Sequence, residues 1–214
     1  MRTTRTTTRR VTLAAVSVTA ALLLAACGND GGSGSHSGGH DSPSASASPS
    51  TAASEGAHNA QDVSFAQGMI PHHRQALEMA GLAADRAGSA QVKDLAARIE
   101  KAQDPEIRTM SGWLTSWGEE VPAGSMPGMD HSGGHSGMPG MMTDEDMADL
   151  KKASGKDFDA MFLTMMIEHH EGAVDMAETE KKSGRYGPAT AMADDIITAQ
   201  TAEITEMNKL LGKS

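Results

Sequence analysis

The sequence contains an internal repeat, which constrains the fold more than any other feature. The block from Phe65 to His73 aligns without a gap with the block from Phe162 to His170, at an offset of 97 residues (162 minus 65). A second block, from Ile99 to Leu114, reappears at 196–211 with the same offset. Two separated blocks in one register indicate that a unit of two helices has been duplicated.

Apolar residues recur at spacings of three and four residues in both halves, which is typical of one face of a helix. The pattern predicts helices over 65–80, 92–117, 143–184 and 188–211, with a turn at Gly88-Ser89. Asn59 with Asp62, and Thr143 with the acids that follow it, are typical helix starts. No segment alternates with period two, so the sequence predicts an all-α antiparallel four-helix bundle built from a duplicated two-helix unit.

Polar residues interrupt these apolar stripes at equivalent positions of the two halves. At about 100° per residue, Glu106 falls on the same helix face as Ile99 and Met110, and its repeat equivalent Glu203 does the same. Counting from the turns places each His-His pair at the level of the glutamate in its own half. Folding the halves about a pseudo-twofold axis then brings into one central layer His72, His73, His169, His170, Glu106 and Glu203, flanked by Met69, Met166, Met110 and Met207.

These side chains predict a metal site. Imidazole binds copper, zinc, nickel and iron, thioethers select Cu(I) and similar soft ions, and carboxylates bind harder ions or orient histidines. The mixture favours a copper ion, Cu(I) or Cu(II), with silver as a related soft ion. Because adjacent helical residues diverge by about 100°, one histidine of each pair can suffice as a direct ligand. The alternative is a metal-free buried layer with ordinary core methionines.

A linker over 122–142 separates the repeats and consists mainly of Pro, Gly, Ser, Met and His. A segment of this composition has no core to fill, so packing does not account for its methionines. Flexible thioether and imidazole donors suit weak, exchangeable capture of Cu(I) or Ag(I). The residues assigned to this secondary capture are Met126, Met129, His131, His135, Met138, Met141 and Met142.

The N-terminus has the order of an export signal, with four arginines, an apolar run from Val11 to Ala26, and then Cys27. The run is shorter than the roughly 20 residues that a membrane-spanning helix needs, and Leu-Ala-Ala-Cys resembles the bacterial lipobox. We therefore expect a lipoprotein signal peptide over 1–26 and lipid attachment at Cys27, on the extracytoplasmic face of a bacterial membrane. A flexible Gly/Ser/His tether over 27–58 then leads to the bundle, over 59–212.

The chain is acidic, with a formal net charge of −10. This charge argues against nucleic acid as a partner. The expected partners are metal ions and, through the lipid anchor, the membrane. Whether the bundle forms a homodimer stays open at this point.

Two pairs of motifs resemble a known family. The blocks Met-Ile-Pro-His-His at Met69 and Met-Ile-Glu-His-His at Met166, with the later Ala-Gln-x-x-Glu-Ile blocks, resemble domain-of-unknown-function family 305 over about residues 60–212. The resemblance implies a ferritin-like four-helix fold, an exported location and, for some members, binding of copper or silver in metal tolerance. Pro71 predicts a bend beside the site, so the two half-sites need not be equivalent.

Two other classes of protein compete with this interpretation. Ferritin-like bundles often house di-iron oxidases, but the Glu-x-x-His pairs of such sites are absent from both repeated blocks. A structural surface lipoprotein would leave the clustering of Met and His unexplained. The motifs of common hydrolases are absent as well. We therefore expect a non-enzymatic, membrane-tethered protein that sequesters copper or hands it on.

Overall fold

The structure is a computed structural model that describes residues 57–123 and 138–213. The predicted signal peptide, Cys27 and most of the tether lie outside these ranges, as do Met126, Met129, His131 and His135. These predictions therefore stay predictions. Within the described ranges, no helix has both the length and the apolar character needed to span a membrane.

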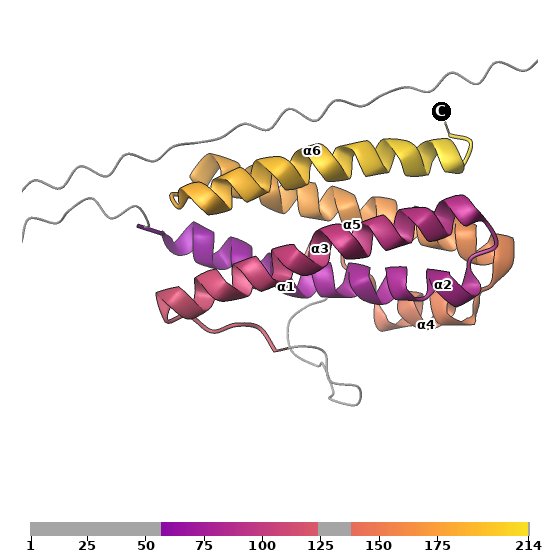
Figure 1. The fold of residues 1–214 in the computed structure, drawn as a ribbon, viewed down its shortest axis with the longest axis horizontal. Helices are drawn as coiled ribbons and strands as arrows, with labels where there is room; N and C mark the ends of the chain where they lie inside the picture. The colour runs from indigo at the N-terminus through magenta and orange to yellow at the C-terminus, as the bar shows by residue number, and fades with distance from the viewer. Residues whose placement is uncertain (1–56, 124–137, 214) are drawn as a thin grey trace, which may run out of the picture. The chain divides into compact units, whose positions relative to one another are not determined.

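The described residues form helices and no strand. The first half contains α1 (Ala60–Gly81), the short α2 (Ala83–Arg86) and α3 (Ala90–Trp117), and the second half contains α4 (Asp144–Lys152), α5 (Gly155–Ser183) and α6 (Gly187–Leu210). Helix α1 packs on α3, α5 packs on α6, and the halves meet along α1 and α5, as Figure 1 shows. The predicted all-α bundle of two helical hairpins is confirmed.

The helix starts follow the capping chemistry expected from the sequence. The Asn59 side chain accepts hydrogen bonds from the backbone N–H groups of Gln61 and Asp62, and the Asp62 carboxylate accepts one from the N–H of Asn59. Thr143 and Asp146 form the same reciprocal pair at the start of α4. Such caps contribute about 1 kcal/mol each, so they fix where the helices begin.

The prediction of one continuous helix over 143–184 is wrong. The chain leaves the helix at Ala153, which is extended, and re-enters it at Gly155. Gly155 has a φ of +61°, a left-handed conformation that glycine adopts without steric penalty. Met147 and Leu150 of α4 still pack into the core. Because the apolar spacing continues across the break, spacing alone does not reveal it.

The buried apolar side chains form two clusters rather than one. The first cluster includes Ala76 of α1 and Met166 of α5, and the second includes Ile70 of α1 and Ala173 of α5. On both helices the boundary between the clusters falls at the His-His pair, halfway along the helix. The core is therefore interrupted at its middle by a polar layer.

Candidate metal centre

Four imidazoles lie at this boundary, and none of them is exposed to solvent. His72 and His73 come from α1, and His169 and His170 come from α5. The ring centroids of His72 and His169 are 3.7 Å apart, with the ring planes inclined at 30°. The two repeat-related halves therefore meet through equivalent histidines. We call these four residues, together with Glu106 and Glu203, the histidine layer.

Each half supplies a carboxylate to its own second histidine. His73 Nε2 lies 2.7 Å from Glu106 Oε2 across α1 and α3, and His170 Nε2 lies 2.7 Å from Glu203 Oε2 across α5 and α6. The glutamate side chains keep 24% and 16% of their exposure, so each carboxylate reaches a buried imidazole from the solvent edge of the bundle. A carboxylate that accepts the Nε2–H fixes the tautomer of a neutral imidazole and leaves Nδ1 with its lone pair.

Three ring nitrogens of the layer are buried without a hydrogen-bond partner among the described residues, namely Nδ1 of His72, His73 and His170. In His72 the opposite nitrogen, Nε2, donates to the carbonyl of Pro139 at 3.1 Å. A buried polar atom left without a partner costs about 1–3 kcal/mol, and native proteins contain few of them. Histidines that ligate a metal have this arrangement, with a carboxylate or carbonyl on one ring nitrogen and the ion on the other.

His72 and His169 are neutral at pH 7. Burial, with a smaller effect from the neighbouring His170, lowers the pKa of His169 to about 3, and burial also holds the pKa of His72 well below its usual range. His169 Nδ1 lies 3.0 Å from the Gly140 carbonyl oxygen, and its Nε2 lies 3.0 Å from that of His72. A neutral imidazole has one N–H, so only one of these carbonyls receives a hydrogen bond. The layer is rich in nitrogen and oxygen lone pairs and poor in hydrogen-bond donors, and this composition favours the binding of a cation.

The end of the linker covers the histidine layer. Gly140 has a φ of +76°, and a Cβ there would lie 2.6 Å from the carbonyl oxygen of Glu168. A Cβ on Gly172 of α5 would collide with the carbonyl oxygen of Pro139, so the turn and the helix are in backbone contact. We call Pro139–Gly140 the covering turn. Its two carbonyls are the ones that contact His72 and His169.

Three of the residues predicted for secondary capture, Met138, Met141 and Met142, lie in the described part of the linker and are half-buried. Gln75 of α1 makes two hydrogen bonds with the backbone of Met142, at 2.9 and 2.8 Å. This end of the linker is therefore fixed to α1 and is not the flexible segment that its composition predicts.

The four methionines predicted to flank the site are fully buried and divided between the two core clusters. Met69 and Met110 belong to the cluster of Ile70, whereas Met166 and Met207 belong to the other. They are not gathered at one point. Nor are any three His, Cys, Asp or Glu side chains of residues 57–123 and 138–213 grouped in a way that would hold a metal ion.

Sequence reasoning did not single out two buried glutamines near the layer glutamates. Gln103 and Gln200 lie one helical turn before Glu106 and Glu203, are 3% and 4% exposed, and have no partner for Oε1 among the described residues. Both belong to the repeated Ala-Gln-x-x-Glu-Ile block. Their position on the buried face, next to a glutamate in both halves, is the signal that could have identified them.

A buried acid pair at one end of α1 and α5 was also missed. Burial alone would raise the pKa of Asp62, but hydrogen bonds from the backbone N–H groups of Tyr186, Asn59 and Arg185 outweigh it and lower the pKa. Burial, reinforced by the nearby Asp62 carboxylate, raises the pKa of Glu180 to about 8. Glu180 is therefore protonated at neutral pH, next to a capping carboxylate that is ionised.

Residues 62–211 match the family model described as Domain of unknown function (DUF305). The crystal structure of a DUF305 protein of Streptomyces coelicolor, assigned as secreted, is 34% identical with a TM-score of 0.63, and the match covers 72% of this chain and 93% of that one. A DUF305 fragment from Deinococcus radiodurans is 31% identical with a TM-score of 0.63, over 73% and 98% of the two chains. No curated protein matches the sequence.

A protein named CopM is also similar. Its Cu(II)-bound form is 35% identical with a TM-score of 0.59, and the match covers 70% of this chain and 94% of that one. CopM has also been solved in Cu(I)-bound and Ag-bound forms. The similarity therefore extends, in sequence and in fold, to a protein that binds these ions.

Proposed function

The chain belongs to the DUF305 family, and from this premise we propose that it is a non-enzymatic extracytoplasmic protein that binds copper or silver ions and sequesters them or hands them on. The observation that carries the proposal is the set of buried, unpartnered Nδ1 atoms on His72, His73 and His170. The similarity to CopM, which has been solved with Cu(I), Cu(II) and Ag bound, supports the choice of ion.

The histidine layer would hold the ion through its imidazoles. Glu106 and Glu203 accept the Nε2–H of His73 and His170 and so direct the Nδ1 lone pairs away from themselves. This arrangement makes the imidazoles better donors and fixes their orientation. The ion itself would supply the positive charge that satisfies the lone pairs. Because no three ligands are already grouped among the described residues, binding requires the imidazoles to turn toward a common point.

The donor set favours soft and borderline ions over hard ones. The carboxylates are engaged by histidines, so few oxygen ligands remain for an iron centre. Neutral imidazoles with methionines in the adjacent core suit Cu(I) and Ag(I). This chemistry supports sequestration rather than the oxygen activation of a di-iron oxidase.

The location and the first capture of ions are proposed from the sequence. The lipobox-like segment before Cys27 supports a lipid anchor outside the cytoplasm, and the assignment of the Streptomyces coelicolor relative as secreted agrees with export. The Met and His residues of the linker would collect ions loosely. The covering turn at the end of that linker contacts the histidine layer directly.

Competitive titration of the purified mature chain with Cu(I), Ag(I), Cu(II), Zn(II) and Fe(II) tests the proposal. We expect tight Cu(I) or Ag(I) binding in the wild type. A His73→Ala/His170→Ala variant should lose one tightly bound ion and keep the binding that the linker methionines provide. The matched control is His58→Ala, because His58 stacks on Trp117 with ring centroids 4.3 Å apart, outside the layer. Circular dichroism would verify that each variant is folded.

Two outcomes would contradict the proposal. Binding that is indifferent to both layer histidines would leave a metal-free hydrogen-bonded layer in the core. Fe(II) binding accompanied by oxygen consumption would instead support the di-iron oxidase class.

A further inference from the structure

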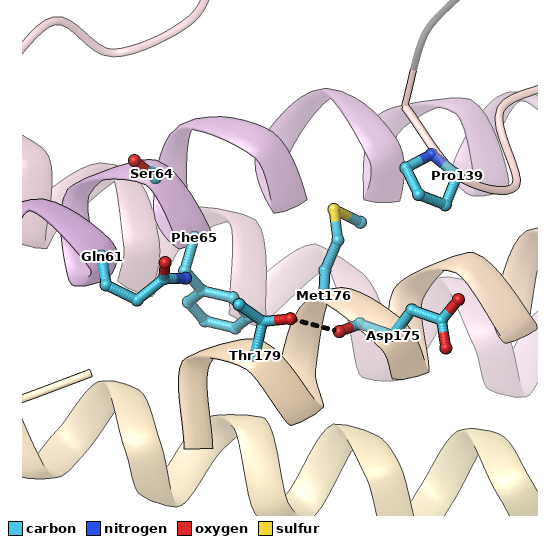
Figure 2. Close-up of a pocket in the computed structure, with 7 residues that line it drawn as sticks. All are labelled: Gln61, Ser64, Phe65, Pro139, Asp175, Met176 and Thr179. Atoms are coloured by element: carbon cyan, nitrogen blue, oxygen red, sulfur yellow. Dashed lines mark hydrogen bonds between the residues drawn. The ribbon is translucent and has the colours of Figure 1, made fainter. Parts of the chain in front are cut away.

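A second group of soft ligand atoms lies outside the histidine layer, at a pocket between α1 and α5. The pocket has a volume of about 280 Å³. Figure 2 shows the Met176 side chain extending from α5 toward α1, with Phe65 on one side and Pro139 on the other. The pocket therefore brings a thioether to the place where the linker joins the bundle.

Gly68 of α1 leaves room for two thioethers at this place. A Cβ on Gly68 would lie 3.6 Å from the Sδ atom of Met176 and 3.8 Å from that of Met138. The two sulfur atoms thus surround one point and are separated by no more than the sum of these distances. Since metal–sulfur bonds are about 2.3 Å long, a modest movement of flexible side chains allows both sulfurs to contact one ion.

Packing and repetition do not account for this arrangement. Met138 and Met176 are half-buried, whereas Met79, the repeat equivalent of Met176, is fully buried. The repeat equivalent of Gly68 is Met165, so the second half has a side chain where the first half leaves space. The pair of sulfurs is therefore a feature of one half and not a consequence of the duplication.

We propose that Met138 and Met176 form a two-thioether site for a monovalent soft ion, Cu(I) or Ag(I). Thioethers are neutral, polarisable ligands that bind such ions in preference to hard divalent cations. Asp175 lines the same pocket, and its carboxylate supplies negative charge near a cation held by neutral ligands. Because both methionines are partly exposed, an ion reaches them from solvent without the bundle opening.

The site adjoins the histidine layer through the covering turn. Met138 directly precedes Pro139, whose carbonyl accepts the hydrogen bond from His72 Nε2. An ion held by the two thioethers lies next to the covering turn, whose carbonyls contact the layer, and this position suits an entry site. Transfer of the ion from the thioethers to the histidine layer rests on the proposed function. Binding by the thioethers alone does not require the histidines to bind a metal.

Titration of the full mature chain, labelled with ¹³C at the methionine methyl groups, with Ag(I) tests the site. Ag(I) is diamagnetic, so each methyl resonance can be followed during the titration. We expect the Met138 and Met176 resonances to move together, and a Met138→Leu/Met176→Leu variant to bind one fewer Ag(I). Gly68→Leu should cause the same loss while both sulfurs are retained, because its side chain would occupy the space between them.

Met192→Leu is the matched control, because Met192 of α6 is a partly buried methionine that packs on the apolar core, and it should leave the stoichiometry unchanged. Methyl resonances of Met138 and Met176 that stay fixed, or an unchanged stoichiometry in the double variant, would overturn the proposal. In the His73→Ala/His170→Ala background the two resonances should still move. Failure of the histidine layer to bind metal is thereby distinguished from failure of the thioether site.

Discussion

The substitution Gly140→Ala isolates the contact between the covering turn and α5. The backbone at Gly140 has a φ of +76°, a conformation that costs an L-residue roughly 1–2 kcal/mol. The added Cβ would also lie 2.6 Å from the carbonyl oxygen of Glu168 and 2.9 Å from that of His169. Since both neighbours are helix backbone, the turn must move away and lose its contacts with His72 and His169.

Gly118→Ala is the matched control for the backbone contribution. Gly118 ends α3 with the same φ of +76°, and no atom lies within 4 Å of the position that a Cβ would occupy there. Gly118→Ala should therefore lower the free energy of unfolding by roughly 1–2 kcal/mol. Gly140→Ala should lower it further, by about 0.5–1.5 kcal/mol, because the hydrogen bond from His72 Nε2 to the Pro139 carbonyl is lost as well.

Urea denaturation of the three proteins measures the difference, and Ag(I) titration of the same samples measures its effect on binding. Gly112→Ala is a further control, because Gly112 lies at an open position within α3. It should raise the free energy of unfolding by about 1 kcal/mol, which would show that replacing a glycine does not by itself destabilise the protein. Equal destabilisation by Gly140→Ala and Gly118→Ala would refute the close packing of the covering turn on α5.

Three further predictions concern the carboxylates and the anchor. Glu106→Gln/Glu203→Gln should weaken Ag(I) and Cu(I) binding roughly 10–100-fold in a competition titration. The control is Glu206→Gln, which breaks only the surface pair with Arg98. An unchanged affinity of the double variant would exclude a role for the layer glutamates. The pKa of Glu180 is raised from 4.5 to about 8 in the folded protein, so its contribution to stability is complete below pH 4.5 and is lost as the pH rises through 8. In the Glu180→Gln variant the free energy of unfolding, measured by urea denaturation at several pH values, should no longer show this decrease. A decrease as steep as that of the wild type would contradict the raised pKa of Glu180. Cys27→Ser should move the protein from the membrane fraction to the soluble fraction, whereas retention in the membrane fraction would exclude a lipid anchor at Cys27.

The sequence predicts the hairpins well because their determinants are local or repeated. The apolar spacing, the Asn59 cap and the Thr143 cap all act within a few residues. The break before α5 escapes prediction for a physical reason. The break lies at Gly155, but Gly68 and Gly172 lie inside continuous helices. A glycine alone therefore does not distinguish a helix break from a position where another segment packs closely against the helix.

The pairing within the histidine layer follows partly from the sequence. Counting along the helices brings His73 to the level of Glu106, and the two side chains are 2.7 Å apart. The sequence does not indicate which ring nitrogens stay unpartnered, because this depends on the covering turn. The contact between His72 and Pro139 joins residues 67 positions apart, and no local pattern encodes it.

The covering turn makes the duplicated site asymmetric. A single linker joins the halves, and its turn lies on α5 at Gly172, which is the repeat equivalent of Gln75 on α1. Glycine at one position lets the backbone approach, while Gln75 holds the following residues of the linker through Met142. His169 consequently has carbonyls on both ring nitrogens, whereas the Nδ1 of His72 has no partner among the described residues. Equivalent histidines thus offer unequal donors, so we expect the layer to hold one ion rather than a symmetric pair.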